Sequence, residues 1–182
     1  IDPDESSHIS ITALQRNYLI IQNDFRDATC AVQFYGTAIN HVVAGNKSWR
    51  AGGFHNVGMQ YAGGWQPSWY IQFLDNEIME GNQGFNGPMN EFPPLESHVA
   101  ALGNAYVPTG AAMNRFTVIR GNKLRNNARI EIGGACEDVI VDSNRVEYTD
   151  TGVTIGGPGS YHGGSPIGVL LHNNRFEKVN VP

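Results

Sequence analysis

The sequence has little charge and no long apolar run. Only 16% of its 182 residues are Asp, Glu, Lys or Arg, and an excess of acids gives a formal net charge of −5. Nucleic acids and anionic membrane surfaces bind basic proteins, so we expect no nucleic-acid partner. A membrane span needs ~18 consecutive apolar residues, so we also expect no membrane insertion.

Cysteine is scarce as well. Cys30 and Cys136 are too few for a disulfide scaffold, and their spacing fits no metal motif. We expect two small buried thiols, with one disulfide bridge as the alternative. We expect no cofactor; a Ca²⁺ site at Asp75, Glu77 and Glu80 is the alternative to a solvated turn.

Glycine and asparagine are abundant instead, with 22 and 18 residues respectively. Both tolerate positive φ angles, and both are poor helix formers. A protein built of long helices or a coiled coil is therefore excluded. The 41% hydrophobic content is enough for a core, and the length is that of a single domain, residues 1–182.

A short apolar run followed by one asparagine recurs six times. These asparagines are Asn23, Asn46, Asn76, Asn122, Asn144 and Asn174. The residue three positions earlier is always apolar, and the residue two positions later is apolar in every case except Ser48. The intervals of 23, 30, 46, 22 and 30 residues indicate a unit of about 22 residues, lengthened by insertions near 47–58, 77–98, 104–115 and 157–167.

A second, Gly-terminated strand follows most of these asparagines. The copies are residues 32–36, 59–63, 130–133 and 153–156, with a weaker one at 100–103, and each alternates apolar and polar residues. A sandwich has no common period of this length, so a stacked solenoid is favoured. We expect the asparagines to bond from coil to coil and to adopt the left-handed turn conformation, above an interior apolar column.

This pattern resembles the right-handed parallel β-helix superfamily, which includes pectate-lyase-like proteins. The resemblance spans about Tyr18 to Phe176 and concerns the construction of the coils. It implies an all-β, right-handed parallel β-helix solenoid of about six coils, an extracellular or periplasmic location, and a polysaccharide or oligosaccharide partner. We expect the chain to be a segment of a longer solenoid, next to further coils or other domains of its parent protein.

The insertions suggest a catalytic site, because loops on a rigid scaffold carry binding and catalysis. We expect His55 and His98 to project side by side, with Arg129 and Glu131 on the neighbouring face. In elimination or hydrolysis of a glycosidic bond, His98 or Glu131 would be the base and Arg129 would stabilise the developing charge. His55 would contact the substrate.

Aromatic and polar side chains near this cleft suit a glycan, because flat rings pack on sugar C–H faces and polar groups bind hydroxyls. The candidates are Trp65, Tyr61 and Glu96. The alternative for Trp65 is a ring that buries its own loop. Tyr61 aligns with the inward Phe34, which argues against its role as a sugar platform.

Two positions before the last three asparagines stand Arg120, Asp142 and His172. On adjacent coils they would form an outward stack of opposite charges, either a charged substrate site or a structural ladder. The sequence thus favours a carbohydrate-active or polysaccharide-binding protein. The alternative is a non-catalytic structural or adhesion solenoid segment.

Overall fold

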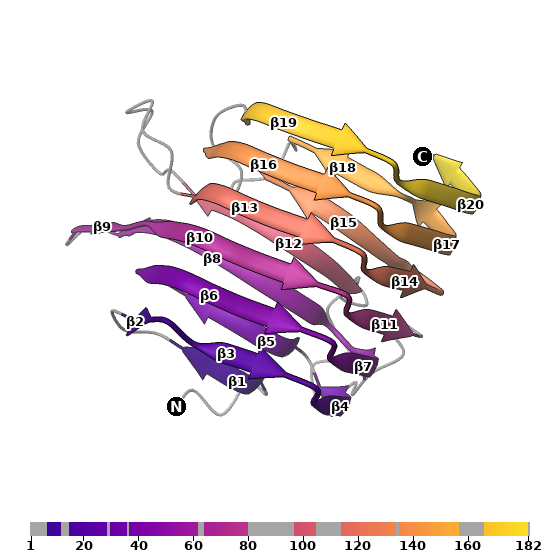
Figure 1. Cartoon of the computed structure of the whole chain (residues 1–182), viewed down its shortest axis with the longest axis horizontal. Coiled ribbons are helices and arrows are strands. Elements are labelled where there is room, and N and C mark those ends of the chain that lie inside the picture. Colours follow the sequence, from indigo (N-terminus) through magenta and orange to yellow (C-terminus); the bar gives the residue numbers. More distant parts are fainter. Residues whose placement is uncertain are drawn as a thin grey trace.

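The computed structural model describes residues 7–11, 15–28, 30–35, 37–61, 64–79, 97–104, 114–133, 135–156 and 166–181. Within these ranges every regular element is a β-strand, and the strands form three sheets (Figure 1). The strand pairs are parallel, apart from an antiparallel hairpin between β8 and β9.

Each sheet takes a different part of the repeat. Sheet B contains the apolar runs before the asparagines: β2 (Gln15–Arg16), β3 (Leu19–Ile21), β6 (Ala38–Ala44), β10 (Ser68–Leu74), β13 (Asn114–Arg120), β16 (Cys136–Asp142) and β19 (Ile167–His172). Sheet C follows the asparagines: β4 (Asp24–Ala28), β7 (Lys47–Ala51), β11 (Glu77–Met79), β14 (Lys123–Arg125), β17 (Arg145–Thr151) and β20 (Arg175–Val181). Sheet A contains β1 (Ser7–Ile11), β5 (Cys30–Tyr35), β8 (Gly53–Tyr61), β12 (Ser97–Asn104), β15 (Ala128–Ile132) and β18 (Val153–Ile155), with β9 (Gly64–Gln66) paired to β8.

The chain passes through sheets B, C and A in turn, and each pass adds one strand beside the previous one. For example, β6 pairs with β10 and β10 pairs with β13, although each pair is separated by a whole repeat. Parallel neighbours need such a crossover, and here the strands of the other two sheets supply it. The all-β, stacked parallel arrangement confirms the coarse prediction and is compatible with a solenoid.

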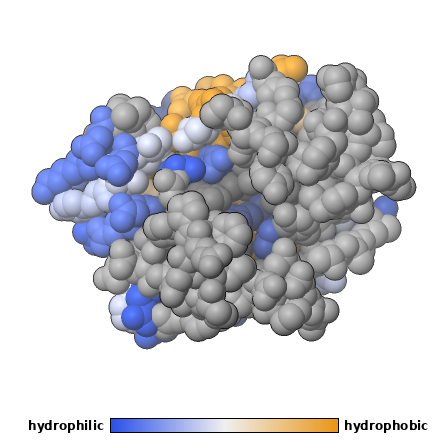
Figure 2. Space-filling model, turned by 180° about the vertical axis from the view of Figure 1, so that it is seen from behind, coloured by the Kyte–Doolittle hydropathy of each residue, from blue (hydrophilic) through white to orange (hydrophobic). Residues whose placement is uncertain are grey.

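The interior is the apolar column that the repeat predicts. Val43, Phe73 and Ile119, each three residues before an asparagine, are fully buried, as are Ile78 and Leu124 two residues after one. Burying each such side chain contributes roughly 1.5–3 kcal/mol. The column ends at β19, where Leu171 occupies the same inward position but is 43% exposed, and apolar atoms gather at this end of the molecule (top of Figure 2).

The repeated asparagines line up at the corner between sheets B and C, as predicted. The backbone N–H and the side-chain Nδ2 of Asn76 both donate to Oδ1 of Asn122, at 2.9 and 3.0 Å. Nδ2 of Asn76 also donates to the carbonyl oxygen of Val43 at 2.9 Å. The same three bonds recur at Asn46 and at Asn144. Each buried amide is thereby satisfied.

The prediction that these asparagines adopt the left-handed conformation was wrong. The residue before each asparagine does so instead, with φ between 51° and 68°; these residues are Gln22, Gly45, Asp75, Gly121, Ser143 and Asn173. This turn directs the asparagine side chain inward, where its amide bonds the neighbouring coils. The preceding side chain points away from the core and can vary.

Sheet A has a register different from the predicted one. Phe54 and Asn56 pair with Val32 and Phe34, so residues 54–57, rather than 59–63, are the equivalent strand segment. The pairing of β7 with β4 and β11 likewise places residues 47–51 within the repeat, so the extra length of this coil follows them. Most of the other three expected insertions lies outside the described residues.

Candidate functional site

The outer face of sheet B carries a column of side chains that strict alternation of inward and outward residues would not produce. Strands β6, β10 and β16 share one burial pattern, in which the second and third residues both face solvent before alternation resumes. The residue six positions before each repeated asparagine has positive φ, between 56° and 68°; these residues are Asn17, Asn40, Tyr70, Phe116, Asp138 and Gly168. A left-handed residue within a strand breaks the period-two alternation that we expected.

Tyr70 and Phe116 form a stacked aromatic pair in this column. Their ring centroids are 4.7 Å apart and their planes differ by 11°. Asparagine, aspartate and glycine adopt positive φ readily, but a tyrosine or phenylalanine there costs roughly 1–2 kcal/mol. Such strain is typical of residues kept for their function.

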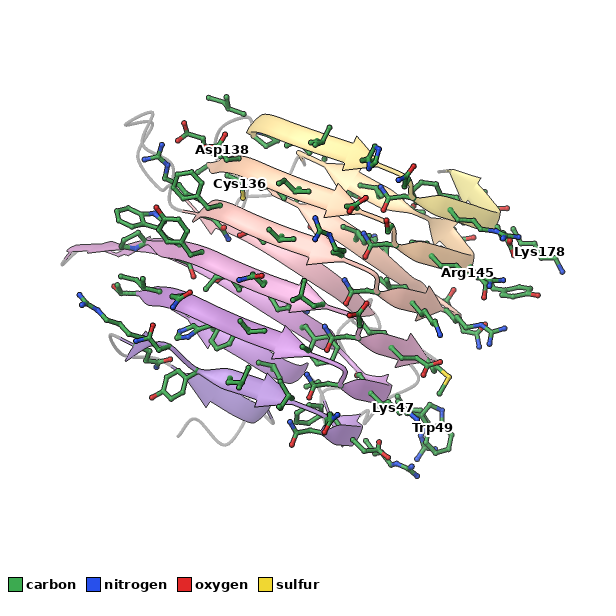
Figure 3. The ribbon with its side chains drawn as sticks, in the orientation of Figure 1. Lys47, Trp49, Cys136, Asp138, Arg145 and Lys178 are labelled. Carbon is green, nitrogen blue, oxygen red and sulfur yellow. The ribbon has the colours of Figure 1, made fainter. Side chains whose placement is uncertain are left out.

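A shallow groove of about 420 Å³ lies along this stack. Its lining consists of Tyr70, Gln72, Phe116, Val118, Asp138, Ile140 and Gly168. The rings of the stack and the aliphatic Val118 and Ile140 provide apolar surface, while Asp138 and Gln72 provide polar groups. Asp138 projects from the outer face of the sheet (Figure 3). The guanidinium of Arg115 lies 5.3 Å from the Phe116 ring centroid and its Nε is 2.8 Å from Glu137, so its charge is paired.

The predicted stack of Arg120, Asp142 and His172 is present on the same face. Nε of Arg120 donates to Oδ2 of Asp142 at 2.9 Å, and Nδ1 of His172 lies 3.0 Å from Oδ1. The hydrogen bond from His172, followed by that from Ser143 and the charge of Arg120, lowers the pKa of Asp142 below its usual value. Both carboxylate oxygens of Asp142 therefore already have a partner within the stack, as expected for a structural ladder of charges. A substrate role for the three residues stays a prediction.

The predicted catalytic residues lie on sheet A. His98 pairs with Arg129 through the backbone, and Ala100 lies between His55 and Glu131 in the register. The register therefore brings His55, His98, Arg129 and Glu131 onto neighbouring strands. Nη2 of Arg129 is 3.2 Å from Oε2 of Glu131, and Nε2 of His55 lies 3.1 Å from the carbonyl oxygen of Gly52.

Of the two candidate bases, only Glu131 has a described side chain. Glu131 is 8% exposed and ion-paired, so it is covered rather than open to a substrate in this state. The side chain of His98 lies outside the described residues. The base and charge-stabilising roles thus stay predictions.

Of the predicted sugar-binding residues, two are described only in their backbone and one is not described. Trp65 and Tyr61 belong to the β8–β9 hairpin, where Trp65 pairs with Gln60 and Tyr61 with Gly64, but their side chains are not described. Glu96 lies outside the described ranges. The sequence analysis missed the pairing of Tyr70 with Phe116. The signal that could have found it is an aromatic residue six positions before the repeated asparagine in two successive repeats.

Among the described residues, no group of three or more His, Cys, Asp or Glu is placed to hold a metal ion. In that same part of the chain, no helix is long and apolar enough to cross a membrane. The side chain of Cys136 is buried, as expected, and the Cys30 side chain is not described.

Comparisons with protein-family models, with curated proteins and with solved structures give no match to this chain.

Proposed function

We propose that the chain is part of a right-handed parallel β-helix and binds an extended polysaccharide along the outer face of sheet B. The observation that carries this proposal is the strained Tyr70–Phe116 stack beside the groove. The asparagine ladder and the stacked parallel sheets support the β-helix, and nearly all crossovers between parallel strands are right-handed. An extracellular or periplasmic location belongs to the same proposal.

The groove has the two kinds of surface that a sugar needs. The rings and the aliphatic floor would pack against C–H faces, and Asp138 and Gln72 would accept or donate hydrogen bonds to hydroxyls. A shallow, open groove that follows the stacking direction suits a polymer better than a compact metabolite.

Cleavage of the bound chain is a second candidate function, favoured by the register of sheet A. That register places His55, His98, Arg129 and Glu131 on neighbouring strands. Glu131 or His98 would remove or transfer a proton, and Arg129 would stabilise negative charge. The remaining alternative is a structural or adhesion segment without ligand.

The test is a glycan array combined with an assay for new reducing ends. We expect the wild-type chain to bind a polysaccharide and Phe116→Ser to weaken that binding roughly tenfold, or ~1.4 kcal/mol. Tyr148→Ser is the matched control, because Tyr148 is also exposed and has positive φ but lies on sheet C. Absence of glycan binding, or equal loss in both variants, would refute the groove.

Cleavage is tested separately by Glu131→Gln and Arg129→Gln. We expect each to abolish new reducing ends while glycan binding on sheet B persists. A wild-type chain that binds but produces no reducing ends would reject the cleavage candidate and leave the binding proposal intact.

A further inference from the structure

Sheet C carries most of the positive charge of the chain. Its six strands contain eight of the 12 Lys and Arg residues but six of the 17 Asp and Glu residues. These strands are therefore net positive although the whole chain has a formal net charge of −5. Hydrophilic residues gather on this side (left in Figure 2), and Trp49, Arg145 and Lys178 project from it (Figure 3). Such a local excess attracts anions.

A second groove, of about 370 Å³, opens on this sheet. It is lined by Trp49, Met79, Arg125 and Asn126. Trp49 pairs with Met79, and the pairing of β11 with β14 continues this row to Arg125. With strands ~4.8 Å apart, Trp49 and Arg125 are the two walls of a gap about 10 Å wide, and Met79 lies between them.

Three arginines lie at or near this groove, of which Arg26 is paired with Asp24 at 2.7 Å. The guanidinium groups of Arg26 and Arg50 lie 5.3 and 4.8 Å from the Trp49 ring centroid. Arg125 is the charged residue of the lining, and no described lining residue is an acid. A neutral sugar also needs acceptors for its hydroxyls, as Asp138 supplies on sheet B. A donor-rich lining instead suits a ligand that brings its own acceptors.

Arg125 is held in place and still has donors to offer. Its Nε donates to Oε2 of Glu147 at 3.0 Å, and its guanidinium carbon lies 5.7 Å from the Tyr148 ring centroid. Glu147 is also bound by Arg145, so this buried carboxylate does not depend on Arg125 alone. Arg125 is 45% exposed in its side chain, which leaves it accessible to a ligand.

We propose that the groove between Trp49 and Arg125 binds an oxyanion carried on a sugar chain, either a sulfate ester or a carboxylate. Arg125 and the amide of Asn126 donate to the oxyanion. Trp49 and Met79 contact the apolar face of the sugar ring. The site lies on a different sheet from the Tyr70–Phe116 groove and can fail or succeed independently of it.

Calorimetric titration with three dextrans of equal length tests the proposal: dextran sulfate, carboxymethyl dextran and neutral dextran. We expect the wild-type chain to bind at least one anionic dextran and to bind it more weakly as NaCl is raised. The anionic dextran that binds identifies the oxyanion. Neutral dextran that binds equally well and is weakened equally by Arg125→Gln, or binding of none of the three, would overturn the proposal.

Single variants distinguish binding in this groove from non-specific attraction to the positive charge of sheet C. We expect Arg125→Gln to weaken binding about tenfold, and Arg175→Gln, which removes an exposed arginine of the same sheet, to weaken it less than about twofold. Trp49→Ala should also weaken it. Circular dichroism checks that each variant is folded. Equal losses in Arg125→Gln and Arg175→Gln would reject the groove.

Discussion

Nδ2 of Asn76 donates to Oδ1 of Asn122 across 46 residues of sequence, at 3.0 Å. Both side chains are buried, and each amide bonds the coils on both sides. A polar group in the interior is tolerated only when its hydrogen bonds are satisfied. The ladder therefore stabilises the stack through its continuity.

Removal of a central rung should cost much more than removal of a terminal one. Asn122→Ala leaves the carbonyl of Phe73 and both donors of Asn76 without their partner, so we expect a loss of ~3 kcal/mol or more in the free energy of unfolding. Asn23→Ala, at the exposed end, should cost less than ~1 kcal/mol. Urea unfolding measures both. Equal losses would contradict a cooperative ladder.

His41 should make the protein less stable in mild acid. It is fully buried, its Nδ1 accepts the backbone N–H of Tyr18 at 3.0 Å, and burial lowers its pKa to about 4. Between pH 6.5 and 4 the unfolded chain takes up a proton that the folded chain does not. The free energy of unfolding should therefore fall by up to about 3 kcal/mol as the pH drops through this window.

The control for this pH dependence is His41→Phe, which keeps a ring against Phe34. Urea unfolding at a series of pH values should show a flatter profile for His41→Phe than for the wild-type chain. His172→Gln, which changes an exposed histidine, should leave the slope between pH 6.5 and 4 nearly intact. An unchanged slope in His41→Phe would contradict the prediction.

The carboxyl group of Asp142 should titrate below its usual pKa. Because the hydrogen bond from His172 is the largest cause, His172→Ala should raise the pKa of Asp142 more than Arg120→Gln does. A carboxyl group whose pKa is lower in the folded than in the unfolded chain stabilises the fold at any pH above its pKa in the unfolded chain. This stabilisation is lost as the pH falls through its pKa in the folded chain. Carbon-detected NMR titration measures the pKa, and a larger effect of Arg120→Gln would reverse the assignment.

Gly121 should be harder to replace than Gly156. Both have positive φ, +68° and +73°, but a Cβ at Gly121 would collide with the carboxylate of Asp75, whereas the space at Gly156 is open among the described residues. We expect Gly156→Ala to cost ~1 kcal/mol and Gly121→Ala about twice that. Asp75→Ala should recover the difference in a double variant. Thermal unfolding of the four proteins checks this.

The repeat predicted the buried positions next to the asparagines. Residues three positions before an asparagine, such as Val43 and Phe73, stack because equivalent positions of successive coils pair in register. These positions are buried in every coil except that of Leu171, and they are therefore apolar. Sheet C was harder to recognise, since β11 has only three residues and a pattern of that length carries little information. In sheet A, the buried Asn56 pairs with the position of Phe34 in the preceding strand. Because asparagine and phenylalanine differ in polarity, the sequence pattern did not indicate that these two strands are equivalent.

The groove on sheet B could not be predicted from the repeat of residue types. Tyr70 and Phe116 contact each other across a long insertion, and both face outward because their backbone is left-handed. Tyrosine and phenylalanine do not mark that conformation by themselves, whereas Asn40, Asp138 and Gly168, at the same position of other coils, favour it.

The sequence alone determined which side chains lie inside the stack next to the repeated asparagines, because burial and amide pairing demand similar residue types there in successive coils. The tertiary structure decided which side chains meet outside it. Those contacts depend on the register and φ angles of strands far apart in the chain, and solvent-facing positions place no common demand on residue type.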